Sequence, residues 1–123
     1  MSALKTTGID HVVLHVRDLD RSIKFYTEVL GMTVHRQRPT QAFLQLGDNQ
    51  VGLFLPHEGE DSVGGGLEIN HLALNIEAGT YEDVKSKLEA AGCRVHGRPG
   101  DEHCVYFADP DGHNLQLVLP GHH

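Results

Sequence analysis

Two short stretches of this chain place a histidine at the same point of the same apolar pattern, sixty residues apart. They are Ile9-Asp10-His11-Val12-Val13-Leu14-His15-Val16 and Ile69-Asn70-His71-Leu72-Ala73-Leu74-Asn75-Ile76. Each is typical of a short strand, whose side chains alternate between two faces. The leucine three residues after each histidine therefore points to the opposite face, toward a core. Two such strands side by side would present the imidazoles of His11 and His71 to a common cavity.

A pair of imidazoles facing one cavity suggests metal chemistry. Imidazole nitrogen is a good ligand for zinc, iron, nickel and copper. The alternative is structural, because a lone histidine on a strand is more often a hydrogen-bonded structural residue than a ligand. The repeated placement of His11 and His71 makes the two interpretations equally strong at this point. Other residues must reach the same cavity if it holds a metal.

Composition limits the classes of function. The chain has 123 residues, 39% of them hydrophobic, which suits one compact domain with a core. No apolar run is long enough to cross a bilayer and no signal segment is visible, so a cytoplasmic location is predicted. A net charge of −7 argues against nucleic acid and anionic membranes as partners. Cys93 and Cys104 match no zinc spacing and are expected to be free thiols.

The elements that position the histidines alternate in a regular order. Strands are predicted at 9–16, 32–36, 41–47 and 51–55, with a helix that follows Asp18 or Asp20 as N-cap and ends at Gly31. The pattern then starts again with a strand at 69–76. A helix opens at Thr80 as in a capping box and closes at Gly92, and strands follow at 94–96, 104–108 and 115–119.

The two halves match residue by residue. Gly31 corresponds to Gly92 and Val34-His35 to Val95-His96, both at an offset of 61, and Leu53–Pro56 corresponds to Leu117–Pro120 at an offset of 64. This predicts an internal duplication of a β-α-β-β-β unit within a single domain spanning 1–123. Module one covers about 9–56, a polar, glycine-rich connector 57–66, and module two about 67–120. We set aside His122 and His123, which are typical of a purification-tag remnant.

Four motifs in this order resemble the vicinal-oxygen-chelate superfamily, which includes glyoxalase I, fosfomycin- and bleomycin-resistance proteins and extradiol dioxygenases. The motifs are Ile9-Asp10-His11, Asp20-Arg-Ser-x-x-Phe25-Tyr26-x-x-x-Leu30-Gly31, Ile69-Asn70-His71 and Asp109-Pro-Asp-Gly-His-Asn-Leu-Gln-Leu117. The resemblance implies a glyoxalase-like α+β fold, in which two tandem βαβββ modules form a cupped mixed sheet. It also implies a divalent metal on the concave floor of the cup.

In metal-binding members of that superfamily, the ligands sit on the first and last strand of each module. The resemblance therefore implies His11 and His71 as ligands. The last strand of module two usually brings a glutamate within Asn-x-Glu-Leu, and here the motif is Asn114-Leu115-Gln116-Leu117. The repeat offset places Gly52 at the matching position of module one. The implied ligand set is His11, His71 and Gln116, which would hold Fe, Ni, Zn or Mn weakly because a glutamine supplies only a neutral carbonyl.

Proton transfer would need a base that this chain lacks at the usual places, since glyoxalase-type members use a ligating glutamate. A standard glyoxalase I activity is therefore not expected. His15 is the candidate proton acceptor, because it lies on the same strand face as His11, roughly 13 Å along by strand rise. Tyr106 matches a tyrosine that helps to hold the substrate in fosfomycin-type enzymes. The basic tail of those enzymes is missing here, so fosfomycin resistance itself is not expected.

Two functions follow as alternatives. The first is a divalent-metal-dependent lyase or dioxygenase acting on an oxygen-chelating small molecule. The second is a metal-free small-molecule binding protein of the bleomycin-resistance kind. A homodimer is the default assembly. The two modules could close a cup within one chain, or they could be exchanged between two chains, which would bring His11 from one subunit to His71 and Gln116 of the other.

Several other residues have two interpretations. The arginines Arg36, Arg38 and Arg98 are interpreted as solvated loop charge rather than as a site for an anionic substrate. His35, His96 and His103 are expected at the surface or rim, and the neighbours Phe25 and Tyr26 in the core. Cys104 could face the cavity, although no nearby group predicts an activated thiol.

Overall fold

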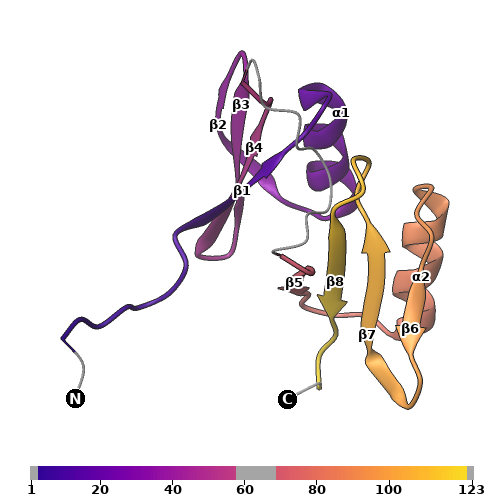
Figure 1. Cartoon of the computed structure of the whole chain (residues 1–123). Coiled ribbons are helices and arrows are strands. Elements are labelled where there is room, and N and C mark those ends of the chain that lie inside the picture. Colours follow the sequence, from indigo (N-terminus) through magenta and orange to yellow (C-terminus); the bar gives the residue numbers. More distant parts are fainter. Residues whose placement is uncertain (1–2, 58–68, 122–123) are drawn as a thin grey trace.

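Module one forms a four-stranded sheet (Figure 1). The computed structural model describes residues 3–57 and 69–121, and this first sheet is built from β1 (His11–His15), β2 (Thr33–Arg38), β3 (Gln41–Leu46) and β4 (Asn49–Phe54). The strand order is β1-β4-β3-β2, with β1 parallel to β4 and the other pairs antiparallel. Strand β1, which carries His11, therefore occupies one edge of its sheet.

Module two repeats this arrangement. Its sheet is built from β5 (Leu72–Asn75), β6 (His96–Arg98), β7 (Asp101–Ala108) and β8 (Asn114–Val118). The order is β5-β8-β7-β6, and β5 is again parallel to β8 and at the edge. The predicted α+β fold with two tandem βαβββ modules is confirmed. Most of the predicted connector at 57–66, and also His122 and His123, lie outside the described residues.

Each module has one helical segment between its first two strands. Helix α1 (Leu19–Lys24) is capped by Asp18, whose carboxylate accepts from the backbone N–H of Arg21, and it continues into the π-helical turn η1 (Phe25–Val29). Helix α2 (Tyr81–Ala90) is capped by Thr80, whose hydroxyl accepts from the N–H of Asp83. Both caps are as predicted. Among the described residues, no helix has the length and apolarity needed to cross a membrane.

The core lies between the helical segments and one face of each sheet. Leu44 and Leu53 come from the first sheet and Val105 and Leu115 from the second, and all four are almost fully buried. Tyr26 of η1 is also completely buried within the same cluster. Burial of these side chains leaves the other face of each sheet free to present polar and aromatic groups.

Polar contacts join the two modules at the turn between β7 and β8, which lies against α1 in Figure 1. The buried carboxylate of Asp111 accepts from the Ser22 hydroxyl at 3.2 Å and the Arg21 guanidinium at 3.0 Å. The buried hydroxyl of Tyr26 donates to Asp109 at 2.7 Å. The Asp-Pro-Asp-Gly segment thus forms the predicted turn and also connects the modules.

A further contact connects this turn to the strand that carries His11. The Nε2–H of His113 donates to the backbone carbonyl of His15 at 2.7 Å. His15 is the last residue of β1, so the end of that strand is fixed to module two through its main chain. The candidate residues on β1 therefore have a defined position relative to the β7–β8 turn.

Candidate functional site

His11 and His71 occupy matching places at the edges of their sheets. His11 is the first residue of β1, and His71 directly precedes β5. Both are exposed, whereas Leu14 and Leu74 point to the other face and pack against the core. This is the alternation that the sequence pattern predicts.

Each histidine is oriented by the side chain directly before it. The Nδ1 atom of His11 lies 2.8 Å from Oδ1 of Asp10, and Nδ1 of His71 lies 2.8 Å from Oδ1 of Asn70. Both oxygens are acceptors, so in a neutral imidazole this contact places the proton on Nδ1 and leaves the Nε2 lone pair available. An outer hydrogen bond of this kind is typical of histidines that bind metals.

The strand registers confirm that Gly52 and Gln116 are equivalent positions. Gly52 of β4 pairs with Val13, two residues after His11. Gln116 of β8 pairs with Ala73, two residues after His71. Each module thus has a histidine on its edge strand and an equivalent neighbour on the next strand, which is a glutamine in one module and a glycine in the other.

Gln116 is buried in a polar cluster. Its Nε2–H donates to Sγ of Cys104 at 3.0 Å, and the Cys104 thiol donates to Asp101 at 3.3 Å. Burial raises the pKa of the Cys104 thiol, and the Asp101 carboxylate raises it further. Arg98 donates to Asp101 at 2.5 Å and holds the pKa of that carboxyl well below its usual range. As predicted, the Cys104 thiol is not activated.

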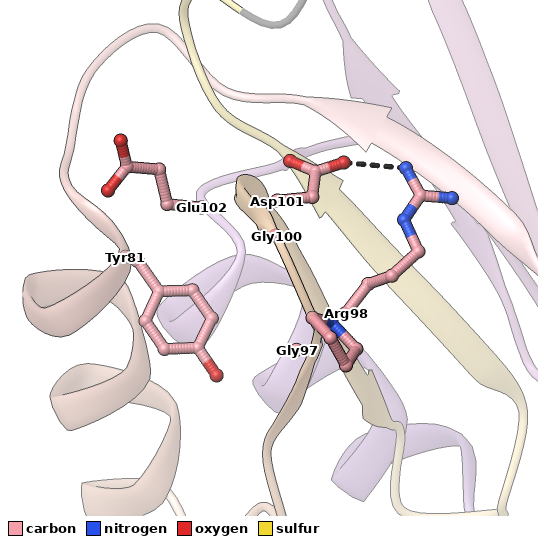
Figure 2. Close-up of a pocket in the computed structure, with 7 residues that line it drawn as sticks. Tyr81, Gly97, Arg98, Gly100, Asp101 and Glu102 are labelled. Carbon is pink, nitrogen blue, oxygen red and sulfur yellow. Dashed lines mark hydrogen bonds and ion pairs between the residues drawn. The ribbon is translucent and has the colours of Figure 1, made fainter.

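Figure 2 shows the outer part of this cluster, at the β6–β7 hairpin. The side chains of Arg98 and Asp101 are bonded to each other across the hairpin. The ring of Tyr81 from α2 lies against Gly97 and occupies the space that a β-carbon at Gly97 would need. The hairpin beside Cys104 is thus held both by an ion pair and by packing on α2.

Tyr106 lies directly opposite Gln116 in the sheet and contacts the candidate ligand of module two. Its ring meets the His71 ring edge-on at a centroid distance of 6.0 Å. His96 stacks on the other side of Tyr106 at 5.3 Å, with the two rings 13° from parallel. A hollow of about 480 Å³ borders all three rings and also Arg98. The structure therefore brings His71 and Tyr106, two predicted site residues, to one open hollow.

Module one has the same three-part arrangement with different residues. Phe43 pairs with Gly52, and its ring meets His11 edge-on at 5.6 Å. The guanidinium carbon of Arg36 lies 5.1 Å from the centroid of the Phe43 ring. Arg36 and Phe43 are direct neighbours across β2 and β3. Arg36, Arg38 and Arg98 are exposed, as their interpretation as solvated charge expects, but all three lie on strands and not in loops.

The remaining predicted site residue, His15, lies in module one. His15 is half-buried at the end of β1, opposite Phe54, and on the same face as His11. His11 and His71 belong to separate sheets and contact different rings. In the part of the chain that the structure describes, no group of three or more His, Cys, Asp or Glu side chains comes together as a metal site. Within residues 3–57 and 69–121, the chain therefore supplies oriented histidines but no complete set of strong ligands.

The fold and the paired histidines place the chain among the vicinal-oxygen-chelate proteins. The family model described as Glyoxalase/Bleomycin resistance protein/Dioxygenase superfamily matches residues 8–117. The match covers most of the chain, so this protein belongs to that superfamily. The resemblance inferred from the four sequence motifs is confirmed.

Two kinds of curated relative show the range of similar enzymes. The glutathione transferase FosA of Serratia marcescens is 33% identical over 111 residues, covering 89% of this chain and 79% of the relative. A probable lactoylglutathione lyase of Vibrio parahaemolyticus is 32% identical over 122 residues, covering 88% of this chain and 87% of the relative. The chain is thus similar to both transferases and lyases along nearly its whole length.

Solved structures share the fold over the whole chain. An integron cassette protein from the mobile metagenome of Halifax Harbour sewage outfall has a TM-score of 0.73 at 29% identity, covering 93% of this chain and 99% of the other. TnmS3, an antibiotic binding protein from Streptomyces sp. CB03234, has a TM-score of 0.75 at 19% identity, with coverages of 96% and 99%. At the lower identity the likeness concerns the fold alone.

Proposed function

We propose that the protein is a vicinal-oxygen-chelate enzyme that binds a divalent metal ion weakly through His11, His71 and Gln116. Its substrate would be a small molecule that offers two neighbouring oxygens. One observation carries the proposal: Nδ1 of each histidine contacts the side-chain oxygen of the residue that precedes it, at the same distance of 2.8 Å. A structural histidine has no need for such a matched arrangement in two modules.

The donor set fits a loosely held ion. The Nε2 atoms of His11 and His71 are free to donate a lone pair, as zinc, iron and nickel require. The amide N–H of Gln116 is engaged by Cys104, which leaves its carbonyl oxygen as the atom that can bind a cation. Two neutral nitrogens and one neutral oxygen do not offset the charge of the ion, so affinity is expected to be low.

The proposed assembly is a homodimer with exchanged modules. His11 stands on the edge strand of one sheet and His71 directly before the edge strand of the other, and an edge strand is where a second chain can approach. In this arrangement His11 of one protomer meets His71 and Gln116 of the other. Two equivalent sites would form in the dimer, and neither would exist in a separated protomer.

The bound ion would polarise the two substrate oxygens and stabilise negative charge on them. Tyr106, edge-on to His71, would orient the substrate in the hollow of about 480 Å³. His15 lies on the face of His11 and is the candidate proton acceptor. Neither Gly52 nor Gln116 is an acid, so the proton transfer of a standard glyoxalase I is not part of the proposal.

The names of the relatives support enzyme chemistry of this type. They include lactoylglutathione lyases, a glutathione transferase and the metallothiol transferase FosB of Staphylococcus haemolyticus, which is 29% identical over 117 residues. A lyase is one of the two reaction classes expected from the sequence, and the transferases add a third. Dioxygenase chemistry is named in the description of the family model that matches the chain.

Metal binding is the direct test. The protein is purified without a chelating column, its metal content is measured by elemental analysis, and Fe(II), Ni(II), Zn(II) and Mn(II) are added while the melting temperature is recorded. At least one ion should stabilise the protein, and His11→Ala and His71→Ala should each abolish the effect. His35→Ala, which removes an exposed imidazole on β2, is the matched control.

Metal content far below one ion per chain, together with no stabilisation by any of the four ions, would overturn the proposal. So would equal loss in the His35→Ala control, because it would mean that binding is not specific to the paired histidines. Analytical ultracentrifugation of the same samples tests the assembly. A monomer that still binds metal with full affinity contradicts the exchanged-module arrangement.

A metal-free binding protein is the second candidate, and one observation favours it. The position in module one that would bring a second oxygen ligand is Gly52, and aromatic side chains close over it. On this alternative, a ligand binds in the cup through the rings and not through an ion. Ligand affinity that is unchanged by EDTA would favour this function over the enzyme.

A further inference from the structure

Equivalent rows of side chains cross the open face of each sheet, next to the candidate histidines. In the first sheet the row is Arg36, Phe43, Gly52 and Val13, and in the second it is His96, Tyr106, Gln116 and Ala73. In both rows an aromatic ring lies beside the position at which related enzymes place an acid. The two rows differ in chemistry, and the difference indicates what module one binds.

At its two central positions, the row of module one has the apolar pair Phe43 and Gly52, where the row of module two has the polar pair Tyr106 and Gln116. A β-carbon on Gly52 would lie 3.1 Å from Phe54, 3.2 Å from Phe43 and 3.2 Å from Val13. The rings of Phe43 and Phe54 meet edge-on at 5.5 Å, and Val13 is 39% exposed. The absence of a side chain at Gly52 thus lets two rings close into a continuous hydrocarbon surface beside His11.

A cation stands at the end of this surface. The Arg36 guanidinium lies over the Phe43 ring, and the whole of β2 is exposed to solvent. Within residues 3–57 and 69–121, Arg36 has no acidic partner in an ion pair. A guanidinium stacked on a ring keeps its N–H edges available for two parallel bonds to a carboxylate. It is an anion-recognising group in a chain whose net charge is −7.

We propose that the surface made by Val13, Arg36, Phe43 and Phe54, called here the ring face, binds a planar aromatic carboxylate. The aromatic part of the ligand would lie on Phe43 and Phe54, and its carboxylate would pair with Arg36. This names the substrate class of the site beside His11 and so deepens the proposed function. Binding to the ring face itself needs no metal, which makes the two proposals separable.

Ligand chemistry is varied one feature at a time to test the ring face. The probe is 2-naphthoate, added to protein treated with EDTA and followed by naphthyl fluorescence, since the chain has no tryptophan to interfere. The neutral amide 2-naphthamide removes the charge, and cyclohexanecarboxylate, measured by calorimetry, removes the aromatic ring. Naphthoate should bind about tenfold more tightly than either analogue, because each loses one charged or aromatic interaction.

Variants then assign each feature to a residue. Arg36→Gln should abolish the preference for naphthoate over naphthamide and leave naphthamide affinity unchanged. Phe43→Leu should weaken both naphthyl ligands about fivefold, since a stacking contact is lost, and should retain a preference for naphthoate because the Arg36 cation is kept. Arg94→Gln, an exposed arginine that is not on the ring face, is the matched control and should have no effect.

The proposal is overturned if naphthoate and cyclohexanecarboxylate bind equally, or if Arg36→Gln leaves the preference for the charged ligand intact. Metal titrations of the same samples distinguish the two proposals. Naphthoate binding with the predicted preferences in a protein that takes up no metal contradicts the proposed enzyme and supports the ring face. Metal uptake without naphthoate binding supports the proposed enzyme and contradicts the ring face.

Discussion

The Nδ1 atom of His71 lies 2.8 Å from the side-chain oxygen of Asn70, and this contact repeats the one between His11 and Asp10. The two contacts differ in one respect. Asp10 is a carboxylate and Asn70 is a neutral amide. A charged acceptor forms a stronger hydrogen bond with the imidazole N–H than a neutral one does, and it holds the ring more firmly. His11 should therefore be the stronger of the two candidate ligands.

Loss of the Asp10 carboxylate should weaken metal binding. Asp10→Ala removes the acceptor for Nδ1, so the imidazole of His11 loses both its orientation and its preferred tautomer. Affinity for Zn(II) or Ni(II) should fall by about tenfold or more, measured by competition with a coloured chelator. Asp48→Ala removes an exposed carboxylate in the β3–β4 turn, and it should leave affinity unchanged. An equal loss in both variants would mean that only net charge matters.

Replacing the glutamine by glutamate should have opposite effects with and without metal. Gln116 is buried beside the Cys104 thiol, so an unpaired carboxylate in Gln116→Glu should destabilise the metal-free protein by about 1–3 kcal/mol. A bound divalent ion would neutralise that charge and raise affinity above that of the parent. Thermal melts with and without Zn(II) measure both effects. No gain in affinity would mean that Gln116 does not converge with the histidines.

Crowding at Gly52 can be tested through stability. The β-carbon of Gly52→Ala would be 3.1–3.2 Å from three side chains, so the rings of Phe43 and Phe54 must shift. We expect a loss of about 1–3 kcal/mol in the free energy of unfolding from overpacking. The loss from overpacking outweighs the usual gain in stability, about 0.5–1 kcal/mol, when alanine replaces a strand glycine. In a Phe43→Leu background the loss measured by urea denaturation should be smaller, and equal losses would contradict the packing argument.

Much of the fold could be predicted from the sequence because capping and turn residues mark the ends of the elements and apolar periodicity marks their buried faces. The caps Asp18 and Thr80 and the strand β3 lie where the pattern places them. The strand predicted at 94–96 is instead β6, at His96–Arg98. It is only three residues long, and its position depends on pairing with β7 and not on its own residues.

Less of the candidate site could be predicted, because it depends on register. The sequence offset of 61 matches His35 with His96. A shift in register after Val34 moves the pairing by one residue, so that Arg36 lies opposite Phe43 as His96 lies opposite Tyr106. Phe43 had no motif to single it out, although it stands at the place of Tyr106. The equivalence of Phe43 and Tyr106 can be recognised only from the pairing of the strands in the structure.

The contact between Tyr26 and Asp109 should make stability depend on alkaline pH. Tyr26→Phe leaves one oxygen of the buried Asp109 without its donor, so the free energy of unfolding at pH 7 should fall by about 1–3 kcal/mol. Burial, reinforced by the Asp109 charge, raises the pKa of the Tyr26 hydroxyl far above its usual range. The folded protein therefore keeps this proton at a pH where the unfolded chain, with a pKa of about 10, loses it.

Because the unfolded chain binds fewer protons above pH 10, the parent should lose stability there by about 1.4 kcal/mol per pH unit from this group. Tyr26→Phe lacks the group, so the difference between the two proteins should shrink as pH rises from 9 to 11. Urea denaturation followed by circular dichroism at each pH measures it. Tyr81→Phe, which removes the half-buried hydroxyl beside Gly97, is the control. A difference between Tyr26→Phe and the parent that stays constant across this range would show that Tyr26 ionises equally in both states.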